Sequence, residues 1–337
     1  QCFLGFLIKK PCLILNIKQG VLNMNKYTKI GLTALAGSLV AGSVSAAEMS
    51  ASGSATMTYT GGDEKANHGN GWVMEDSVTF SASGDVNDIG VTYSVELDGD
   101  AKATAGTGGV DSYSLTFDLG DAGTLVFGGH GTGGFLDGND DVMPTASEEP
   151  WDVISGADTG RVSGYAGDNA FKYTYAHESG LNLTAYYVNA SDAGTDVSYT
   201  DYGVTYTGME GLTLGYGTGD VEQTTGTKSD ESTLFAKYAI GGATVGIQKS
   251  EQDNETASDV ESTGIGISYA VNDDLTVSYG SNTREIVGGT DQEATAIGAS
   301  YTMGSLGISV SFNQIDNINN SGANDREAYQ LGLSFAF

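Results

Sequence analysis

The sequence predicts an all-β protein, namely an up-and-down antiparallel transmembrane β-barrel of about sixteen strands. Three observations after residue 46 predict this fold. Apolar residues alternate with polar ones in segments of about ten residues, and no convincing run has the i, i+3, i+4, i+7 spacing of an amphipathic helix. The connections between segments alternate between short and long. A tilted strand of roughly ten residues is long enough to cross a bilayer.

The period-two segments follow one another along the whole region, and each is expected to form one strand. We count sixteen, at residues 54–60, 76–84, 89–97, 113–119, 123–129, 170–176, 181–189, 201–207, 212–217, 232–240, 243–248, 263–271, 275–281, 294–303, 306–313 and 328–337. Seven short turns and eight long polar loops connect them in alternation. The long loops are expected at about 61–75, 99–109, 130–168, 190–198, 219–231, 251–261, 284–292 and 315–327. This alternation is typical of a barrel with both termini on the short-turn side.

The two faces of these strands differ in a way that argues against a soluble β-sandwich. One face is apolar and repeatedly carries tyrosine near a short turn, at Tyr175, Tyr206, Tyr238, Tyr269 and Tyr301. The other face consists mainly of Gly, Ser, Thr, Asn and charged residues, which could not form a dry core but could line water. The aromatic positions fit the girdle of a membrane barrel at the lipid interface.

Residues 24–46 are expected to be a signal peptide. Two lysines precede a short apolar run at 30–40, and Val44 and Ala46 occupy the −3 and −1 positions of a cleavage site. A transmembrane anchor is disfavoured because the apolar run is well short of the roughly 18 residues needed to span. We therefore expect cleavage after Ala46 and a barrel domain at 47–337.

Residues 1–23 precede this leader and contain no Met. We interpret them as translated upstream sequence, the alternative being a genuine N-terminal extension. Both cysteines, Cys2 and Cys12, lie in this stretch. Disulfides, cysteine metal ligands and cysteine nucleophiles are therefore excluded from the expected barrel domain.

The barrel domain is strongly acidic. Five of the 14 Lys and Arg residues precede the cleavage site and none of the 43 Asp and Glu residues does, so nine bases face 43 acids, a net charge of −34. This balance argues against nucleic acid as a partner and favours cations.

Several features together resemble a Gram-negative general porin, and the nearest resemblance is to the alphaproteobacterial, Rhodobacter-type branch. They are the signal peptide, the sixteen strands, the long third loop, the segment "DNAFKYTYAHESGLNLTAYY" and the terminal Phe337. The resemblance implies an outer-membrane homotrimer that passes small hydrophilic solutes and ions by passive diffusion. It also implies that the long third loop folds into the lumen as the constriction.

The long loop at 130–168 is where the resemblance places this constriction. It holds two of the chain's three prolines and one of its two tryptophans, which suggests a shaped loop. Its acids are the predicted constriction residues, namely Asp137, Asp140, Asp141, Glu148, Glu149, Asp152 and Asp158. These carboxylates either are merely solvated or form a negative ring that enriches cations in a narrow aqueous passage.

Porins of this kind place basic residues on the wall opposite the acidic loop. Strand phase or position suggests four candidates, Arg161, Lys172, Lys237 and Arg284. This set is thinner than the family pattern, which disfavours an anion-selective or phosphate-selective channel. Four acids share the inward phase, Glu96, Asp98, Asp118 and Asp201, so we expect a cation preference.

No cofactor is expected to be required, although Ca²⁺ as a structural ion fits the oxygen-rich clusters. The candidate ligands are Asp140, Asp141, Glu148 and Glu149, which do not have the spacing of an EF-hand loop. Acidic loops could also bind lipopolysaccharide through divalent ions. A structural or adhesive barrel with Ca²⁺-binding loops is therefore the alternative function.

The sequence gives little support for an enzyme. His68, His130 and His177 are the only histidines, and each lies in a loop or at a strand end. A barrel phospholipase would need a Ser–His pair held by a third polar group, and the nearest candidate is His177 with Ser179 in the short turn "HESG". We expect a turn-exposed histidine there instead.

The last segment, "AYQLGLSFAF", is expected to close the barrel against the first strand so that no edge is left unpaired in lipid. Its apolar row is Tyr329, Leu331, Leu333, Phe335 and Phe337. By resemblance, the terminal aromatic is the signal that the outer-membrane assembly machinery reads.

Overall fold

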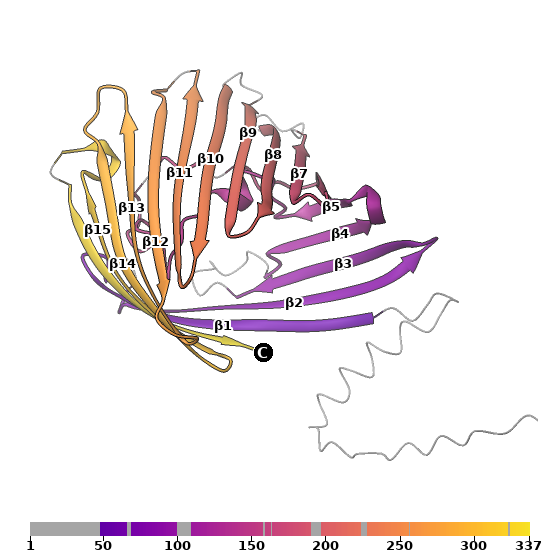
Figure 1. Ribbon diagram of the computed structural model, residues 1–337, viewed down its shortest axis with the longest axis horizontal. Coiled ribbons are helices and arrows are strands. Elements are labelled where there is room, and N and C mark those ends of the chain that lie inside the picture. The colour runs from indigo at the N-terminus through magenta and orange to yellow at the C-terminus, as the bar shows by residue number, and fades with distance from the viewer. Residues whose placement is uncertain are drawn as a thin grey trace, which may run out of the picture. The chain divides into compact units, whose positions relative to one another are not determined.

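Sixteen antiparallel strands form a closed barrel in which each strand pairs with its neighbours in sequence and β1 pairs with β16 (Figure 1). The computed structural model describes residues 48–65, 69–99, 109–157, 159–162, 164–189, 197–223, 228–255, 257–322 and 324–337. The expected leader and upstream segment, residues 1–46, lie outside this description. The predicted all-β barrel of sixteen strands is confirmed.

The strands follow the chain without a crossover. They are β1 (Glu48–Gly62), β2 (Trp72–Val86), β3 (Ile89–Asp98), β4 (Ser112–Asp118), β5 (Thr124–His130), β6 (Ala170–Ala176), β7 (Leu181–Val188), β8 (Val197–Met209), β9 (Leu212–Gln223), β10 (Lys228–Ile240), β11 (Ala243–Asn254), β12 (Val260–Ala270), β13 (Leu275–Ile286), β14 (Gln292–Met303), β15 (Leu306–Asp316) and β16 (Arg326–Ala336). Three short 3-10 helices occur in the described connections, η2 (Gly120–Ala122), η3 (Asp137–Asn139) and η4 (Ile318–Asn320). Among the described residues no helix is long and apolar enough to cross a membrane.

Several strands are longer than the sequence pattern predicts. The polar loop expected at 219–231 is instead mostly strand, because β9 continues to Gln223 and β10 begins at Lys228, with Asp220 opposite Asp230. A ladder of backbone hydrogen bonds needs no apolar side chains once it leaves the lipid, so the apolar alternation ends before the strand does.

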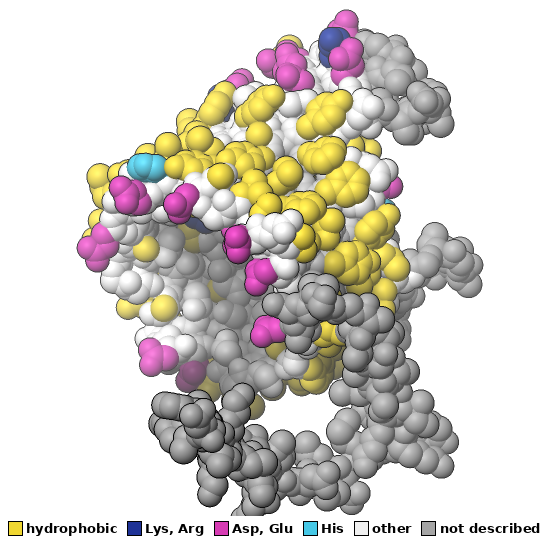
Figure 2. Space-filling model, turned by 90° about the vertical axis from the view of Figure 1, so that its right-hand side faces the viewer, with side chains coloured by type: hydrophobic (Ala, Val, Ile, Leu, Met, Phe, Trp, Pro, Cys, Tyr) yellow, Lys and Arg dark blue, Asp and Glu magenta, His cyan; other side chains and the backbone are white. Residues whose placement is uncertain are grey.

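The barrel exposes apolar side chains on its outside and buries polar ones on its inside. Leu234 is 58% exposed and Ile297 63%, whereas the inward-facing Gln248 and Asn313 are fully buried. Figure 2 shows hydrophobic side chains as a broad area on one face of the molecule, with acidic side chains towards its margins. This is the reverse of a water-soluble protein and suits a surface that meets hydrocarbon.

The two ends of the chain's barrel domain close the wall. Strand β16 pairs with β1 from Ala328 opposite Gly62 to Ala336 opposite Ser54, and the N–H of Phe337 donates to the Gly53 carbonyl at 2.9 Å. The predicted closing strand is therefore confirmed, and its apolar row faces outward with Phe337 82% exposed.

The short turns are compact. Between β2 and β3 the two residues Asn87 and Asp88 both have positive φ, 52° and 65°, the conformation of a type I′ hairpin turn. Asn and Asp tolerate this conformation better than most residues, which explains why the sequence places them between two β-branched strand ends.

Candidate pore constriction

The connection between β5 and β6 leaves the wall through a narrow neck. The N–H of Gly167 donates to the Thr132 carbonyl at 3.2 Å. The buried Tyr186 hydroxyl on β7 braces the same neck, because it donates to the Thr132 carbonyl at 2.7 Å and accepts from the Gly167 N–H at 2.9 Å. Residues 133–166 therefore start and return at one place on the wall, and we call this segment the constriction loop.

The first part of the constriction loop is held by Asp201 on β8. Its carboxylate accepts hydrogen bonds from the N–H groups of Phe135 at 2.9 Å and Leu136 at 3.2 Å. Asp201 is completely buried, so it is not the pore-wall acid that its strand phase suggested. Phe135 and Leu136 complete the attachment in an apolar cluster with Val162, Val188 and Phe235, among others.

The middle of the loop lies on glycines of the inward face. A Cβ on Gly246 or Gly266 would come within 2.6 or 3.0 Å of the Pro144 ring, and one on Gly280 within 3.1 Å of the Pro150 ring. Polar side chains between these glycines bind the loop backbone. The N–H of Ala146 donates to Ser278 Oγ at 2.8 Å, and Gln248 Nε2 donates to the Asn139 carbonyl at 2.8 Å.

The second part of the loop packs on the last strands. Trp151, Val153 and Ile154 form an apolar cluster with residues of β14, β15, η4 and β16, namely Ala294, Ile315, Ile318 and Ala328. Asn313 Nδ2 on β15 donates to the carbonyls of Glu149 at 3.0 Å and Pro150 at 3.2 Å. Every strand residue in these contacts has the inward phase, so the loop lies against the inner face of β8–β16.

A cavity of about 680 Å³ remains between the loop and the opposite part of the wall. From the loop it is lined by Glu148 and Asp152, and from the wall by the acids Glu75, Asp76 and Asp98. Its other lining residues include Thr56, Thr58, Ser77 and Gln330. Carboxylates thus occur on both sides of this cavity, with hydroxyl groups between them.

The other two wall acids have different surroundings. Glu96 on β3 accepts hydrogen bonds from Ser77 Oγ at 2.5 Å and Ser112 Oγ at 3.3 Å, which fix its carboxylate to the wall next to the cavity. Asp118 is exposed at the short-turn end of β4 and is not among the five acidic residues that line the cavity.

The structure does not place the two predicted arginines, Arg161 and Arg284, on a basic wall opposite the loop. Arg161, near the end of the loop, turns its side chain towards the wall, with its guanidinium 5.0 Å from the centre of the Trp151 ring and next to Gly264 on β12. Its three guanidinium nitrogens are buried and have no hydrogen-bond partner among the described residues. Arg284 is 7% exposed and bonds to Asn320, covered by Gly160 of the loop. Strand phase predicted the inward direction of Arg284, and Arg161 was placed by its position at the loop's return, but neither could show that the loop backbone covers both side chains.

The two lysines remain partly exposed on inward-phase positions. Lys172 on β6 lies close enough to Asp137 and Asp201 to lower the pKa of Asp137, although burial raises that pKa more. Lys237 is at the short-turn end of β10. Neither lysine is among the residues that line the 680 Å³ cavity.

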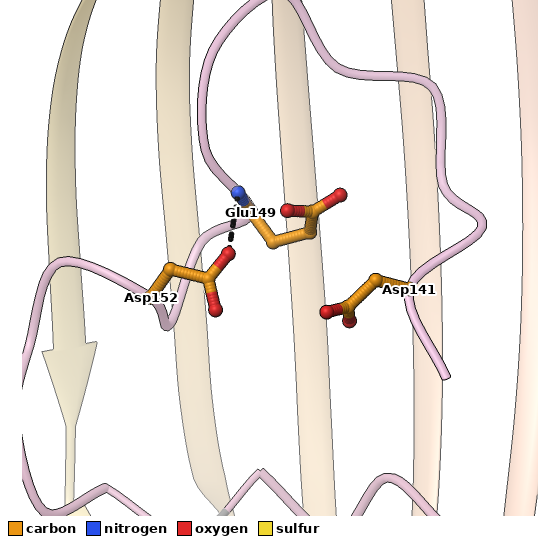
Figure 3. A group of neighbouring side chains, drawn as sticks. All are labelled: Asp141, Glu149 and Asp152. Carbon is orange, nitrogen blue, oxygen red and sulfur yellow. Dashed lines mark hydrogen bonds between the residues drawn. The ribbon is translucent and has the colours of Figure 1, made fainter. Parts of the chain in front are cut away.

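Three loop carboxylates converge, and they differ from the predicted set of four. Carboxylate oxygens of Asp141, Glu149 and Asp152 all lie within 4.8 Å of one another, and the Glu149 N–H donates to Asp152 Oδ2 at 3.0 Å (Figure 3). Asp140 and Glu148 are not in this group, although they are nearby in sequence. The backbone turn at 149–152 brings Asp152 into the group instead.

Burial raises the pKa of every described loop acid with a resolved shift, namely Asp137, Asp140, Asp141, Glu148 and Glu149. The pKa of Asp141 rises to about 7 because of burial, with further upward contributions from Asp140 and Asp152. Burial and the neighbouring Asp152 also raise the pKa of Glu149. Burial lowers the pKa of Arg161 to about 10, against the opposing effect of Asp141 and Glu149. The predicted constriction residue Asp158 lies outside the described residues.

The described histidines have local partners. His177 Nδ1 bonds to Ser179 Oγ at 2.8 Å within the exposed turn between β6 and β7. His130 Nδ1 is 2.6 Å from Asp168 Oδ1 at the neck of the constriction loop. Both pairs are exposed and lie at turns or loop ends, as the sequence positions suggest.

Glu75, an acid on the inner wall, was not predicted from the sequence. The second strand was expected to begin at residue 76, so Glu75 fell outside it. The alternating exposed residues Trp72 and Met74 would have shown that the strand begins earlier and that Glu75 points inward.

Comparisons with known proteins agree with this architecture. The family model described as Gram-negative porin matches residues 31–286 and 261–337. No curated protein sequence matches the chain.

Solved structures are similar in fold at low sequence identity. The anion-selective porin from Comamonas acidovorans is 13% identical with a TM-score of 0.68, covering 86% of this chain and 100% of that one. A trimer form of the outer membrane protein OmpT of Vibrio cholerae is 16% identical with a TM-score of 0.64, covering 87% and 100%. A mutant of the Rh. blastica porin is 14% identical with a TM-score of 0.64, covering 86% and 100%.

Proposed function

Because this chain belongs to the family of Gram-negative porins, we propose that it is a cation-preferring diffusion channel of the outer membrane whose narrowest part is at the constriction loop. The observation that carries the cation preference is the cavity with Glu148 and Asp152 on one side and Glu75 and Asp98 on the other. Small hydrophilic solutes and cations would diffuse through it passively, without a cofactor or a chemical step.

The positions of the bases support this preference. Arg161 and Arg284 lie between the loop backbone and the wall, where Arg161 offsets the charge of loop carboxylates, and neither lines the cavity. A narrow water-filled passage with low-dielectric walls focuses the field of its carboxylates, which raises the local concentration of cations and lowers that of anions.

Reversal potentials in planar bilayers under a salt gradient test this proposal. We expect single-channel steps and a cation-selective reversal potential for the wild type. In the double variant Glu75→Lys/Asp98→Lys, the cation-to-anion permeability ratio should fall at least about fivefold, on the scale of 1 kcal/mol for unit charges 4 Å apart in water.

The matched control is Glu285→Lys, which makes the same change in charge at an exposed, outward-phase position on β13 and should leave the ratio near the wild-type value. A wild-type protein without conductance steps would contradict the channel itself. A wild-type reversal potential that favours chloride would contradict only the cation preference.

Assembly as a homotrimer in lipopolysaccharide-containing membrane, export by cleavage near Ala46, and placement in the Rhodobacter-type branch are parts of the same proposal. The trimer form of OmpT supports the first by analogy of fold. The outward apolar row that ends at Phe337 fits insertion by the outer-membrane assembly machinery. The mass of the detergent-solubilised native complex distinguishes a trimer from a monomer.

A Ca²⁺ ion at the constriction loop is a second, separable proposal. Asp141, Glu149 and Asp152 supply carboxylate oxygens close enough together for one ion, whose coordination would need further oxygens from backbone or water. Isothermal titration with Ca²⁺ should show binding that Asp152→Asn abolishes, and an unchanged titration in that variant would exclude this site. Binding without conductance would favour the alternative of a structural barrel.

A further inference from the structure

An ion pair between a fully buried carboxylate and a partly exposed guanidinium joins the constriction loop to the place where the barrel closes. The Glu64 side chain, just after the end of β1, is completely buried. Its Oε1 accepts from Arg326 Nη1 at 2.8 Å, while its Oε2 accepts from the Ser155 N–H at 3.2 Å and from Ser155 Oγ at 2.7 Å. Arg326 Nη1 also donates to the Ser155 carbonyl at 3.0 Å. We call these three residues the latch.

The latch connects three parts of the chain that are far apart in sequence. Arg326 begins β16, and Glu64 follows the strand with which β16 pairs. Next to the latch the same junction is tied by the Asp63 N–H, which donates to the Glu327 carbonyl at 2.9 Å, and by the Glu327 N–H, which donates to Asp63 Oδ2 at 3.0 Å. Ser155, the third member, comes from the second part of the constriction loop.

The latch lies next to a residue that lines the pore. Ser155 is three residues after Asp152, and the turn between them is closed by the Ile154 N–H, which donates to the Trp151 carbonyl at 3.1 Å. A shift of Ser155 would therefore carry Asp152 with it and change the width and charge of the cavity.

Stability alone does not account for an ion pair at this position. The apolar cluster of Trp151, Val153 and Ile154 already attaches this part of the loop, and a buried ion pair is rarely more stabilising than well-packed apolar residues of similar size. Apolar contacts are not directional, whereas a carboxylate that accepts on both oxygens from three defined donors allows one position of the loop backbone.

We propose that Glu64 and Arg326 are positioning residues that fix the second part of the constriction loop relative to the barrel junction, and that the pore reaches its final width only when β1 and β16 have closed. This inference rests on the proposed channel function. It adds a specific mechanism by which wall closure and the size of the constriction depend on each other.

Single-channel recordings of latch variants test the proposal. In Glu64→Gln the two oxygens become one oxygen and one amide, so Arg326 loses its ionic partner while the side-chain size is kept. We expect mean open-state conductance to change and the time spent at additional conductance levels to rise at least about tenfold over wild type, because Arg326 and Ser155 lose the charged acceptor that fixes their positions. Arg326→Met should behave in the same way, and Arg326→Lys, which keeps the charge, should restore most of the wild-type behaviour.

The matched control is Lys249→Met on β11, which removes an exposed basic residue paired with Glu251 at 2.7 Å and Glu261 at 3.0 Å on outward-phase positions. It should leave conductance levels unchanged. Wild-type conductance and substate occupancy in both Glu64→Gln and Arg326→Met would overturn the proposal, as would equal disturbance in Lys249→Met.

Two further measurements separate an effect on folding from an effect on conductance. The heat-dependent shift in gel mobility reports whether the barrel is closed. If Glu64→Gln does not fold, the milder Ser155→Ala still removes the Oγ contact with Glu64 and should raise the time spent at additional conductance levels by a smaller factor. A Ser155→Ala barrel with wild-type recordings would then overturn the latch. A wild type that does not conduct contradicts the channel proposal itself, so the two failures are distinguishable.

Discussion

The two halves of the barrel wall share one strand pattern but face the lumen differently. From β8 to β15 the inward positions hold several glycines together with buried apolar residues such as Phe235 and Ile315, and the constriction loop packs on them, with Pro144 on Gly246 and Gly266. From β1 to β4 the inward positions hold Ser, Thr and carboxylates, and next to β1–β3 they line the open cavity. The two halves therefore differ in what their inward side chains offer: glycines and apolar groups contact the loop on one side, whereas hydroxyl groups and carboxylates line the cavity on the other.

The same division separates the charges. The covered half of the wall contains Arg284 and the buried Asp201, with Arg161 of the loop turned towards it, whereas the open side carries Glu75 and Asp98. The loop thus places buried bases behind it and carboxylates in front of it. Three predictions test whether side-chain size and burial maintain this division.

The largest effect is expected from filling the glycine surface. Gly266→Val places a branched side chain where even a Cβ would lie 3.0 Å from Pro144. Overpacking of this kind costs about 1–3 kcal/mol or displaces the loop into the open half. We expect lower single-channel conductance, or a lower unfolding temperature if the loop does not move.

Gly84→Val is the matched control, because nothing lies within 4 Å of a Cβ at Gly84 on β2. If Gly266→Val conducts and unfolds like the wild type, contact between glycine and loop does not define the covered half.

A smaller effect is expected from Asp201→Ala, which removes the acceptor for the N–H groups of Phe135 and Leu136. Unsatisfied buried donors cost about 1–3 kcal/mol, although the apolar cluster around Phe135 remains. We expect a lower denaturation midpoint and noisier conductance, measured by urea titration and by single-channel recording. Asp201→Asn keeps one oxygen acceptor, so its denaturation midpoint should lie between those of the wild type and Asp201→Ala. A lower midpoint in Asp201→Asn than in Asp201→Ala would contradict this role of Asp201.

The smallest effect is a pH dependence of ion selectivity. Burial raises the pKa of Asp141 to about 7, so this carboxyl gains negative charge as pH rises from about 6 to 8. The cation-to-anion permeability ratio should increase over that interval, and Asp141→Asn should flatten the increase. A pH-independent ratio in the wild type would show that Asp141 does not influence the passage.

The raised pKa of Asp141 also predicts the direction in which the stability of the fold changes with pH. Because the pKa of Asp141 is higher in the folded protein than its ordinary value of 3.8, the folded state binds the proton more tightly between these two values. Its contribution therefore stabilises the fold at low pH and is lost as pH rises towards 7. Asp141→Asn should remove this component from the pH profile of the denaturation midpoint.

Much of the wall could be predicted from residues close together in sequence. The alternation in "AYQLGLSFAF" gave the closing strand and the outward row that ends at Phe337, because side chains on a strand alternate with period two whatever surrounds them. The same rule gave the inward direction of Glu96, Asp98 and Asp201. It failed for strand ends such as 219–231, because polar strands outside the lipid show no alternation.

The site was less predictable because the loop has no such periodicity. The acidic composition of the loop was visible, yet its convergent carboxylates include Asp152 in place of Asp140 and Glu148. The burial of Arg161 on Trp151 depends on how the loop turns back, and no spacing of residues encodes that turn.

The sequence by itself determined the barrel, its sixteen strands, their inward and outward faces and the excess of negative charge, because these follow from local alternation and from composition. Only the tertiary structure decided which inward residues meet water. That depends on where residues 133–166 lie, and their position is set by contacts between residues up to 171 positions apart, such as Arg326 with Ser155. The direction of a side chain on a strand follows from the strand's own backbone, whereas the path of a loop across the inner face depends on contacts with strand residues that are distant in sequence.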